Sequence, residues 1–87
     1  MPKFEKEVTI MNPQGLHARP AAMFVQIAVK YDCKVTVKKD DEAVNGKSIM
    51  GILMLGAQHQ QKITLVVDGD DAEKVMTELE AFLSKHE

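Results

Sequence analysis

The length, composition and charge of the chain exclude several classes of protein before any motif is considered. With 87 residues, the chain is predicted to form one domain over residues 1–87, because domains usually span about 100 to 150 residues. Hydrophobic residues make up 45% and charged residues 28%, a balance typical of a folded globular protein. Eleven basic against thirteen acidic side chains give a net charge of −2, so the chain lacks the positive field that favours nucleic acid.

Hydropathy and cysteine content exclude further classes. No apolar run approaches the ~20 residues needed to cross a bilayer, and the charged N-terminal segment lacks the apolar core of a signal peptide. We therefore expect a cytoplasmic protein with no membrane insertion. Cys33 is the only cysteine, which excludes internal disulfides and Cys-rich zinc sites, and we expect neither a metal nor a cofactor.

The first half of the chain predicts a strand, a helix and a second strand. Val8 and Ile10 alternate with polar residues in the predicted strand 4–10. Residues 20–30 are apolar at most positions, and a core-facing stripe recurs there at helical spacing: Ala21, Val25, Ala28 and Val29. Apolar and polar residues alternate over 33–38, which is typical of a strand with one face in water.

The second half predicts two strands and two helices. Residues 43–45 form a short strand, and Ser48 caps a short helix that Gly56 ends in the left-handed conformation. Residues 63–67 repeat the alternation of a strand. Asp70 and the glutamate three residues later resemble a capping box before the last helix. The apolar stripe of that helix comprises Ala72, Val75, Met76, Leu79, Phe82 and Leu83.

This order of elements, β-α-β-β-α-β-α, predicts the fold class. One-sided strands alternating with amphipathic helices favour an antiparallel sheet whose helices pack on a single face. We predict an α+β open-faced two-layer β-sandwich, with four antiparallel strands and three helices on one face.

The segment Gly15-Leu16-His17-Ala18-Arg19-Pro20-Ala21 lies where the first strand gives way to the first helix. Pro20 suits the first turn of a helix, which is predicted to begin at 18–20 with an alanine at the capping position. An alanine side chain caps nothing, so the backbone N–H groups of Ala18 and Arg19 are predicted to bind an anion. The Arg19 guanidinium suits a phosphate, and a phosphoryl group on the neighbouring His17 imidazole would be held by these donors.

Other histidines and the cysteine carry simpler interpretations. A histidine near a helix start is often only a surface or capping residue, and His17 is distinguished by Arg19, Pro20 and the uncapped turn. His59 lies in a polar loop and His86 lies near the terminus, and neither has a neighbouring arginine or an uncapped helix turn. Both are predicted to be exposed and to have no function in phosphoryl transfer. Cys33 alternates onto the core face of its strand, which favours a packed thiol over a reactive one.

At this point the chain resembles a known family over its whole length. The segment 15–21 resembles the phosphohistidine signature of HPr, the histidine-containing phosphocarrier of the bacterial phosphoenolpyruvate-dependent sugar phosphotransferase system. The resemblance implies that phospho-enzyme I phosphorylates His17 on Nδ1, that Arg19 steadies the phosphoryl group, and that the IIA component of sugar permeases receives it. It implies a phosphocarrier rather than an enzyme.

A second segment, Lys47-Ser48-Ile49-Met50-Gly51, resembles the regulatory serine segment of the same family. The plain interpretation of Ser48 is a helix N-cap, and the two interpretations are compatible. The resemblance implies an HPr kinase/phosphorylase that modifies Ser48 and a catabolite repressor that binds the product. Enteric members have the serine without this control.

The first two helices contain more apolar residues than one layer of helices can bury against a small sheet. An exposed apolar patch beside His17 suits partner docking, and the resemblance implies that enzyme I and IIA proteins dock there. The predicted docking residues are Ala22, Met23, Phe24, Ile27, Ile49, Met50, Gly51, Leu53 and Met54. Enteric members carry lysines where this chain has Gln26, Val29 and Gly51, which argues against exchange with enteric partners.

Three alternatives to a sugar-branch phosphocarrier remain at this point. The chain could be an HPr-like regulatory binding module in which Ser48 controls docking and no phosphoryl groups are transferred through His17. The presence of His17 argues against this alternative. It could be a nitrogen-branch phosphocarrier with the same chemistry. An open sheet could also bind RNA or a small ligand, but one tyrosine and no tryptophan provide no stacking platform. We expect a monomer.

Overall fold

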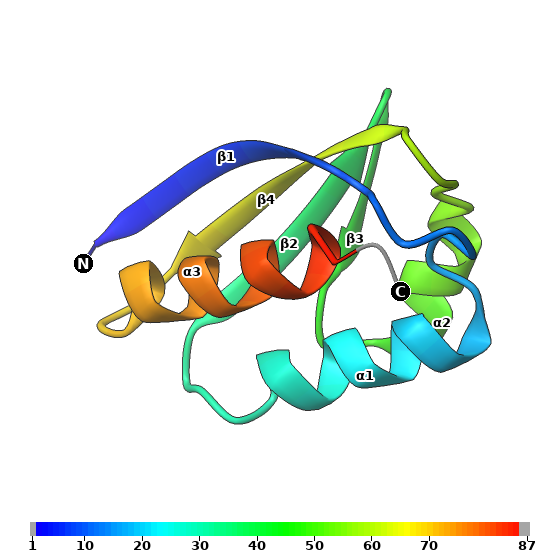
Figure 1. Ribbon diagram of the computed structural model, residues 1–87. Coiled ribbons are helices and arrows are strands. Elements are labelled where there is room, and N and C mark those ends of the chain that lie inside the picture. Colours follow the sequence, from blue (N-terminus) through cyan, green and yellow to red (C-terminus); the bar gives the residue numbers. More distant parts are fainter. Residues whose placement is uncertain (1, 86–87) are drawn as a thin grey trace.

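Strand β4 (Lys62–Asp68) lies at the centre of the sheet, between β1 (Lys3–Thr9) and β2 (Lys34–Lys39). Strand β3 (Glu42–Asn45) pairs with the other side of β2, which gives the order β1-β4-β2-β3. All three pairings are antiparallel. The computed structural model describes residues 2–85, and its sheet is shown in Figure 1.

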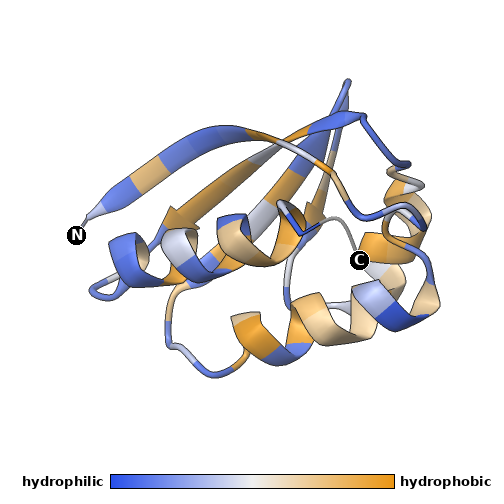
Figure 2. Cartoon of the chain, in the orientation of Figure 1, coloured by the Kyte–Doolittle hydropathy of each residue, from blue (hydrophilic) through white to orange (hydrophobic). Residues whose placement is uncertain are grey.

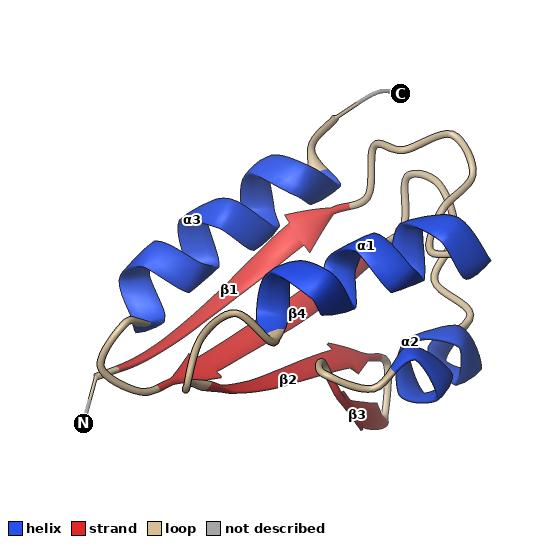
Figure 3. Ribbon diagram, turned by 90° about the horizontal axis from the view of Figure 1, so that it is seen from below, coloured by secondary structure: helices blue, strands red, loops and turns tan. Residues whose placement is uncertain are grey.

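Three helices cover one face of this sheet: α1 (Ala18–Ala28), α2 (Ile49–Leu55) and α3 (Ala72–Leu83). Figure 3 shows α1 between the other two helices, and α1 contacts both of them. The opposite face of the sheet carries no helix among the described residues. The structure therefore confirms the predicted open-faced two-layer fold.

The core lies between the two layers. Strands alternate as predicted, so that β1 buries Val8 and β2 buries Val35 and Val37. Apolar segments recur along the strands and helices in Figure 2. Cys33, just before β2, is 2% exposed, which confirms a packed thiol. The predicted stripe of α3 is confirmed as well: Ala72, Val75, Met76, Leu79 and Leu83 are buried, and Phe82 packs partly buried against the core.

The ends of two helices differ from the prediction. Helix α1 ends at Ala28, so Val29 is its C-cap and is 54% exposed instead of belonging to the core stripe. Helix α3 has Asp71 as its N-cap, and no side-chain bond caps it, so the predicted capping box of Asp70 and Glu73 is wrong. Helix ends fray and shift by one or two residues, so sequence patterns locate them less well than they locate the helix itself.

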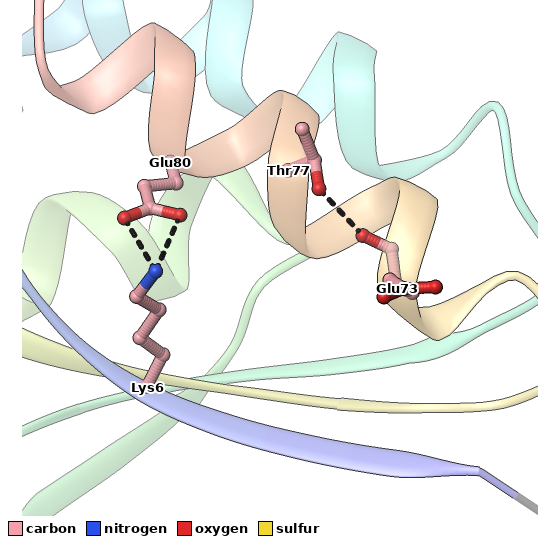
Figure 4. Close-up of polar contacts among 4 residues, drawn as sticks. All are labelled: Lys6, Glu73, Thr77 and Glu80. Carbon is pink, nitrogen blue, oxygen red and sulfur yellow. Dashed lines mark hydrogen bonds and ion pairs between the residues drawn. The ribbon is translucent and has the colours of Figure 1, made fainter.

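Polar contacts attach α3 to the strand β1 beneath it. Lys6 Nζ lies 2.8 Å from Oε2 and 2.9 Å from Oε1 of Glu80, and Figure 4 shows this contact. On the helix itself, the Thr77 hydroxyl donates to the Glu73 carbonyl at 3.0 Å (Figure 4). Exposed ion pairs contribute little to stability, so this pair orients α3 more than it stabilises the fold.

A second cluster joins the end of α1 to α3 and to the segment before α2. The Tyr31 hydroxyl donates to Glu78 Oε1 at 2.7 Å, and Lys30 Nζ lies 3.1 Å from Glu78 Oε2. The hydrogen bond from Tyr31 lowers the pKa of the Glu78 carboxyl, and the same bond raises the pKa of Tyr31. Lys47 Nζ donates to the Tyr31 carbonyl at 2.6 Å.

Phe24 corrects one prediction for the docking residues. Its side chain is fully buried, whereas the neighbouring Met23 is 48% exposed. A helix turns by about 100° per residue, so successive apolar residues of a helix face different environments. Phe24 is therefore a core residue and cannot contact a partner.

Paired substitutions test this division. We expect Phe24→Ala to lower the free energy of unfolding by about 3 to 5 kcal/mol, because a large buried side chain is lost and a cavity remains. Met23→Ala should change the free energy by less than about 0.5 kcal/mol, as exposed positions usually do. Urea denaturation of both variants measures the difference, and equal small losses would contradict the burial of Phe24.

Candidate functional site

His17 follows a tight turn at the end of the loop after β1. The Asn12 side chain accepts from the N–H of Gln14 at 2.8 Å, and the Asn12 carbonyl accepts from the N–H of Gly15 at 2.9 Å. Gly15 has φ +64°, in the left-handed region that favours glycine. The turn brings the chain to His17, which is exposed.

This loop is held against the segment that follows α2. The N–H of Leu16 donates to the Ala57 carbonyl at 2.9 Å, and the Leu16 side chain is buried in the core. A Cβ atom on Gly15 would lie only 2.8 Å from the Ala57 oxygen and 2.9 Å from Gln58 Cα. The close approach of these two backbones requires glycine at position 15, and it fixes the position of His17.

The start of α1 provides the predicted uncapped turn, with a different residue at the cap. His17, not an alanine, is the N-cap, and its side chain makes no capping hydrogen bond. The N–H of Ala21 donates to the His17 carbonyl at 2.8 Å, which closes the first turn. Among the described residues, no backbone carbonyl accepts from the N–H groups of Ala18 or Arg19, and Pro20 has no N–H.

These donors directly follow His17 at the start of α1. Two N–H groups and the positive end of the helix dipole favour an anion at this position. Arg19 is exposed in the same turn, and within residues 2–85 no acidic side chain forms an ion pair with it. The arrangement can hold the oxygens of a phosphoryl group next to the imidazole, through backbone donors and a planar guanidinium.

Ser48 occupies the N-cap of α2, as predicted. Its hydroxyl accepts from the N–H of Gly51 at 3.0 Å, and Gly56 ends the helix at φ +65°. Ser48 is partly exposed, and the next two residues, Ile49 and Met50, are exposed. A charge on Ser48 would therefore enter an apolar surface.

Several apolar residues of α1 and α2 remain exposed to water, within or close to the two signature segments. Most of the predicted docking residues are at least partly exposed: Met23, Ile49, Met50, Leu53 and Met54 are exposed, and Ala22, Ile27 and Gly51 are half-buried. Met50 and Met54 are the most exposed, at 67% and 73%. We call these eight residues the docking surface. Val29, 54% exposed at the end of α1, was missed because its spacing suits the core stripe.

The other candidate groups of the sequence are two histidines, a possible metal site and a possible membrane span. His59 is exposed in the loop after α2, as predicted, and His86 lies outside the described residues. Residues 2–85 contain no group of three or more His, Cys, Asp or Glu side chains that could hold a metal ion. Within the same residues, no helix combines the length and the apolar character needed to cross a membrane.

The match to a family model decides which group of proteins this site belongs to. Residues 4–85 match the model described as the PTS HPr component phosphorylation site. The chain belongs to the HPr family. This membership confirms the resemblance that the two signature segments indicate.

Relatives and solved structures agree with the family and the fold. An HPr-like protein Crh from Halalkalibacterium halodurans is 42% identical over 93% of this chain and 96% of its own length. A phosphocarrier protein HPr from Haloferax volcanii is 40% identical over 95% of this chain and 96% of its own. The crystal structure of an HPr from Bacillus anthracis has a TM-score of 0.92 at 38% identity, and the match covers 95% of this chain and 99% of that one.

Two glycines with nearly equal φ test how the loop before His17 is held. We expect Gly56→Ala, where no atom lies within 4 Å of the added Cβ, to lose only the cost of a left-handed alanine, about 1 to 2 kcal/mol. Gly15→Ala should lose more, because the added Cβ also meets the Ala57 carbonyl. Urea unfolding measures both losses, and the NMR signals of the His17 ring should move only in Gly15→Ala. Equal losses would contradict the close approach.

Proposed function

We propose that this protein is a phosphocarrier that accepts a phosphoryl group on His17 from phospho-enzyme I and passes it to the IIA component of sugar permeases. One observation carries the proposal: an exposed histidine is the N-cap of α1, and its side chain leaves the first N–H groups of the helix uncapped. Membership of the HPr family supports the same assignment. The protein is then a substrate of one enzyme and a donor to another, rather than an enzyme.

The chemistry requires few groups. An imidazole nitrogen of His17, Nδ1 by analogy with the family, forms a bond to phosphorus as the bond between phosphorus and the donor's leaving group breaks. The N–H groups of Ala18 and Arg19 and the Arg19 guanidinium hold the phosphoryl oxygens and stabilise their negative charge. Transfer to the acceptor reverses the bond changes at His17. Because these donors are already in place, no rearrangement of α1 is needed.

Docking of successive partners requires a surface that adapts. The docking surface is rich in methionine, whose flexible side chain packs against differently shaped partners. It flanks the start of α1, so a protein that covers it brings its own reactive group near His17. We assign the docking of enzyme I and of IIA proteins to this surface. Phe24 is not part of it, because its side chain is buried.

Ser48 provides a point of control. A phosphate there lies at the start of α2, where the N–H groups of the first turn favour negative charge, so the fold tolerates it. A partner that covers Ile49 and Met50 must desolvate that charge, so docking weakens. An HPr kinase/phosphorylase would add the phosphate, and a catabolite repressor would bind the product.

Two comparisons favour a second candidate function. A relative 42% identical to this chain is named as an HPr-like protein Crh, and the solved Crh of Bacillus subtilis, 35% identical, is described as a catabolite repression HPr. These names suit a regulatory binding module, for which Ser48 is the candidate control point. The presence of His17 favours a phosphocarrier over a regulatory module. A phosphocarrier of the nitrogen branch, with the same chemistry at His17 but a regulatory acceptor, is a further alternative. In either role we propose a monomer in the cytoplasm.

Labelling of His17 tests the carrier function. Incubation with phosphoenolpyruvate and the enzyme I of the same organism should add one acid-labile phosphoryl group to the parent chain, because phosphohistidine is lost in acid. His17→Ala should abolish the label while the far-UV circular dichroism stays native, and His59→Ala should keep it. Intact mass before and after acid treatment gives the measurement, and a label that persists in His17→Ala would contradict the assignment.

Substitution of Ser48 tests the control. We expect Ser48→Asp to keep a helix cap and to raise the KM of enzyme I for this protein several-fold, because a charge enters the docking surface. Its thermal midpoint should equal or slightly exceed that of the parent.

Ser48→Ala is the matched control. It removes the cap without adding charge, so it should lower the free energy of unfolding by about 1 kcal/mol and leave KM unchanged. Steady-state phosphorylation and thermal melts of both variants separate the two effects. The gating hypothesis is contradicted if enzyme I phosphorylates His17 as readily in Ser48→Asp, and in the chain that carries a phosphate on Ser48, as in the parent. Ser48 is then only a helix cap.

A further inference from the structure

A hollow of about 440 Å³ lies on the side of α1 that faces α3, away from α2. Figure 1 shows the loop after β1 running from near the end of α3 to the start of α1. Residues from all three line the hollow: Asn12, Pro13, Gln14, Arg19, Pro20, Met23, Phe82 and Lys85. It shares Arg19 with the phosphoryl site and Met23 with the docking surface.

The walls of this hollow are held together by backbone hydrogen bonds. The N–H of Met11 donates to the Leu83 carbonyl at 2.9 Å, which joins the loop after β1 to the last turn of α3. The turn at Asn12 is closed by its two hydrogen bonds, and the N–H of Lys85 donates to the Phe82 carbonyl at 3.4 Å. The hollow is therefore built into the fold and is present before a partner arrives.

The chemistry of the lining selects its occupant. Pro13, Pro20, Met23 and Phe82 give it an apolar floor, whereas Arg19 and Lys85 are positive and no carboxylate is among the described residues that line it. This local excess of positive charge contrasts with the net charge of −2 of the whole chain. A larger hollow of about 540 Å³ on the open sheet face mixes lysines with Glu5, Glu7 and Asp40, so its charges select no ligand of one sign.

We propose that the hollow is a second docking subsite, which receives an apolar side chain and a neighbouring carboxylate of enzyme I, the proposed phosphoryl donor to His17. Lys85 binds the carboxylate, and Met23 and Phe82 contact the apolar side chain. The subsite continues the docking surface around the start of α1, so a partner holds both sides of the turn that carries His17. This inference rests on the proposed function and adds the chemistry of the partner to it.

Neutralising one lysine tests the subsite, with a second lysine as the matched control. Lys85→Gln should raise the KM of the organism's own enzyme I for this protein about two- to fivefold at low ionic strength, the effect of losing one exposed ion pair, and leave kcat unchanged. High salt should remove the difference. Lys62→Gln, an exposed lysine on the open face, should change neither parameter.

A second measurement maps the contact directly. On addition of unlabelled enzyme I, the side-chain amide signals of Asn12 and Gln14 should shift in the NMR spectrum of the parent chain, and the backbone signal of Thr36 on the open face should not. An unchanged KM for Lys85→Gln, equal effects of the two lysines, or a loss of kcat at constant KM would each overturn the subsite. Failure of enzyme I to label the parent chain would overturn the proposed function instead, and the inference with it.

Discussion

The hydrogen bond from the N–H of Leu16 to the Ala57 carbonyl holds together the two segments that flank the candidate site. It joins two loops that lie far apart in the sequence, one after β1 and one after α2. Gly15 permits the approach, since a larger residue would meet the Ala57 oxygen. Because of this contact, the start of α1 and the end of α2 are fixed relative to each other, and His17 is held near the apolar surface of α2.

The site gives up local stability in two places. A serine, threonine, asparagine or aspartate at the N-cap of α1 would stabilise the helix by about 1 kcal/mol, yet the position holds a histidine that caps nothing. Polar residues in place of the exposed methionines and leucine of α2 would remove apolar surface from contact with water. Both features suit a protein that binds an anion at the helix start and partners beside it, and they belong together on the two helices farthest from β1.

Helix α3 supports the site from the other side. Its apolar stripe packs on the sheet, the ion pair of Lys6 with Glu80 orients it over β1, and the bond from Met11 to the Leu83 carbonyl attaches its last turn to the loop before His17. The cluster of Tyr31 and Glu78 attaches its middle to the end of α1. These contacts hold α1 from the side of α3, whereas the other helix of the docking surface, α2, has only seven residues.

The sequence by itself determined the elements and indicated the candidate site residues, because both depend on short-range patterns. Period-2 alternation identified the strands, Ser48 and Gly56 bounded α2, and the segment from Gly15 to Ala21 indicated a histidine at an uncapped helix start. Only the tertiary structure decided which apolar residues of α1 face water, because apolar residues occupy most positions of this helix and extend beyond its core-facing stripe. It placed Phe24 in the core and Val29 outside it, and it moved the cap from an alanine to His17. The strand order, the contact with Ala57 and the hollow beside Lys85 also required the structure, since each depends on segments that the chain brings together only on folding.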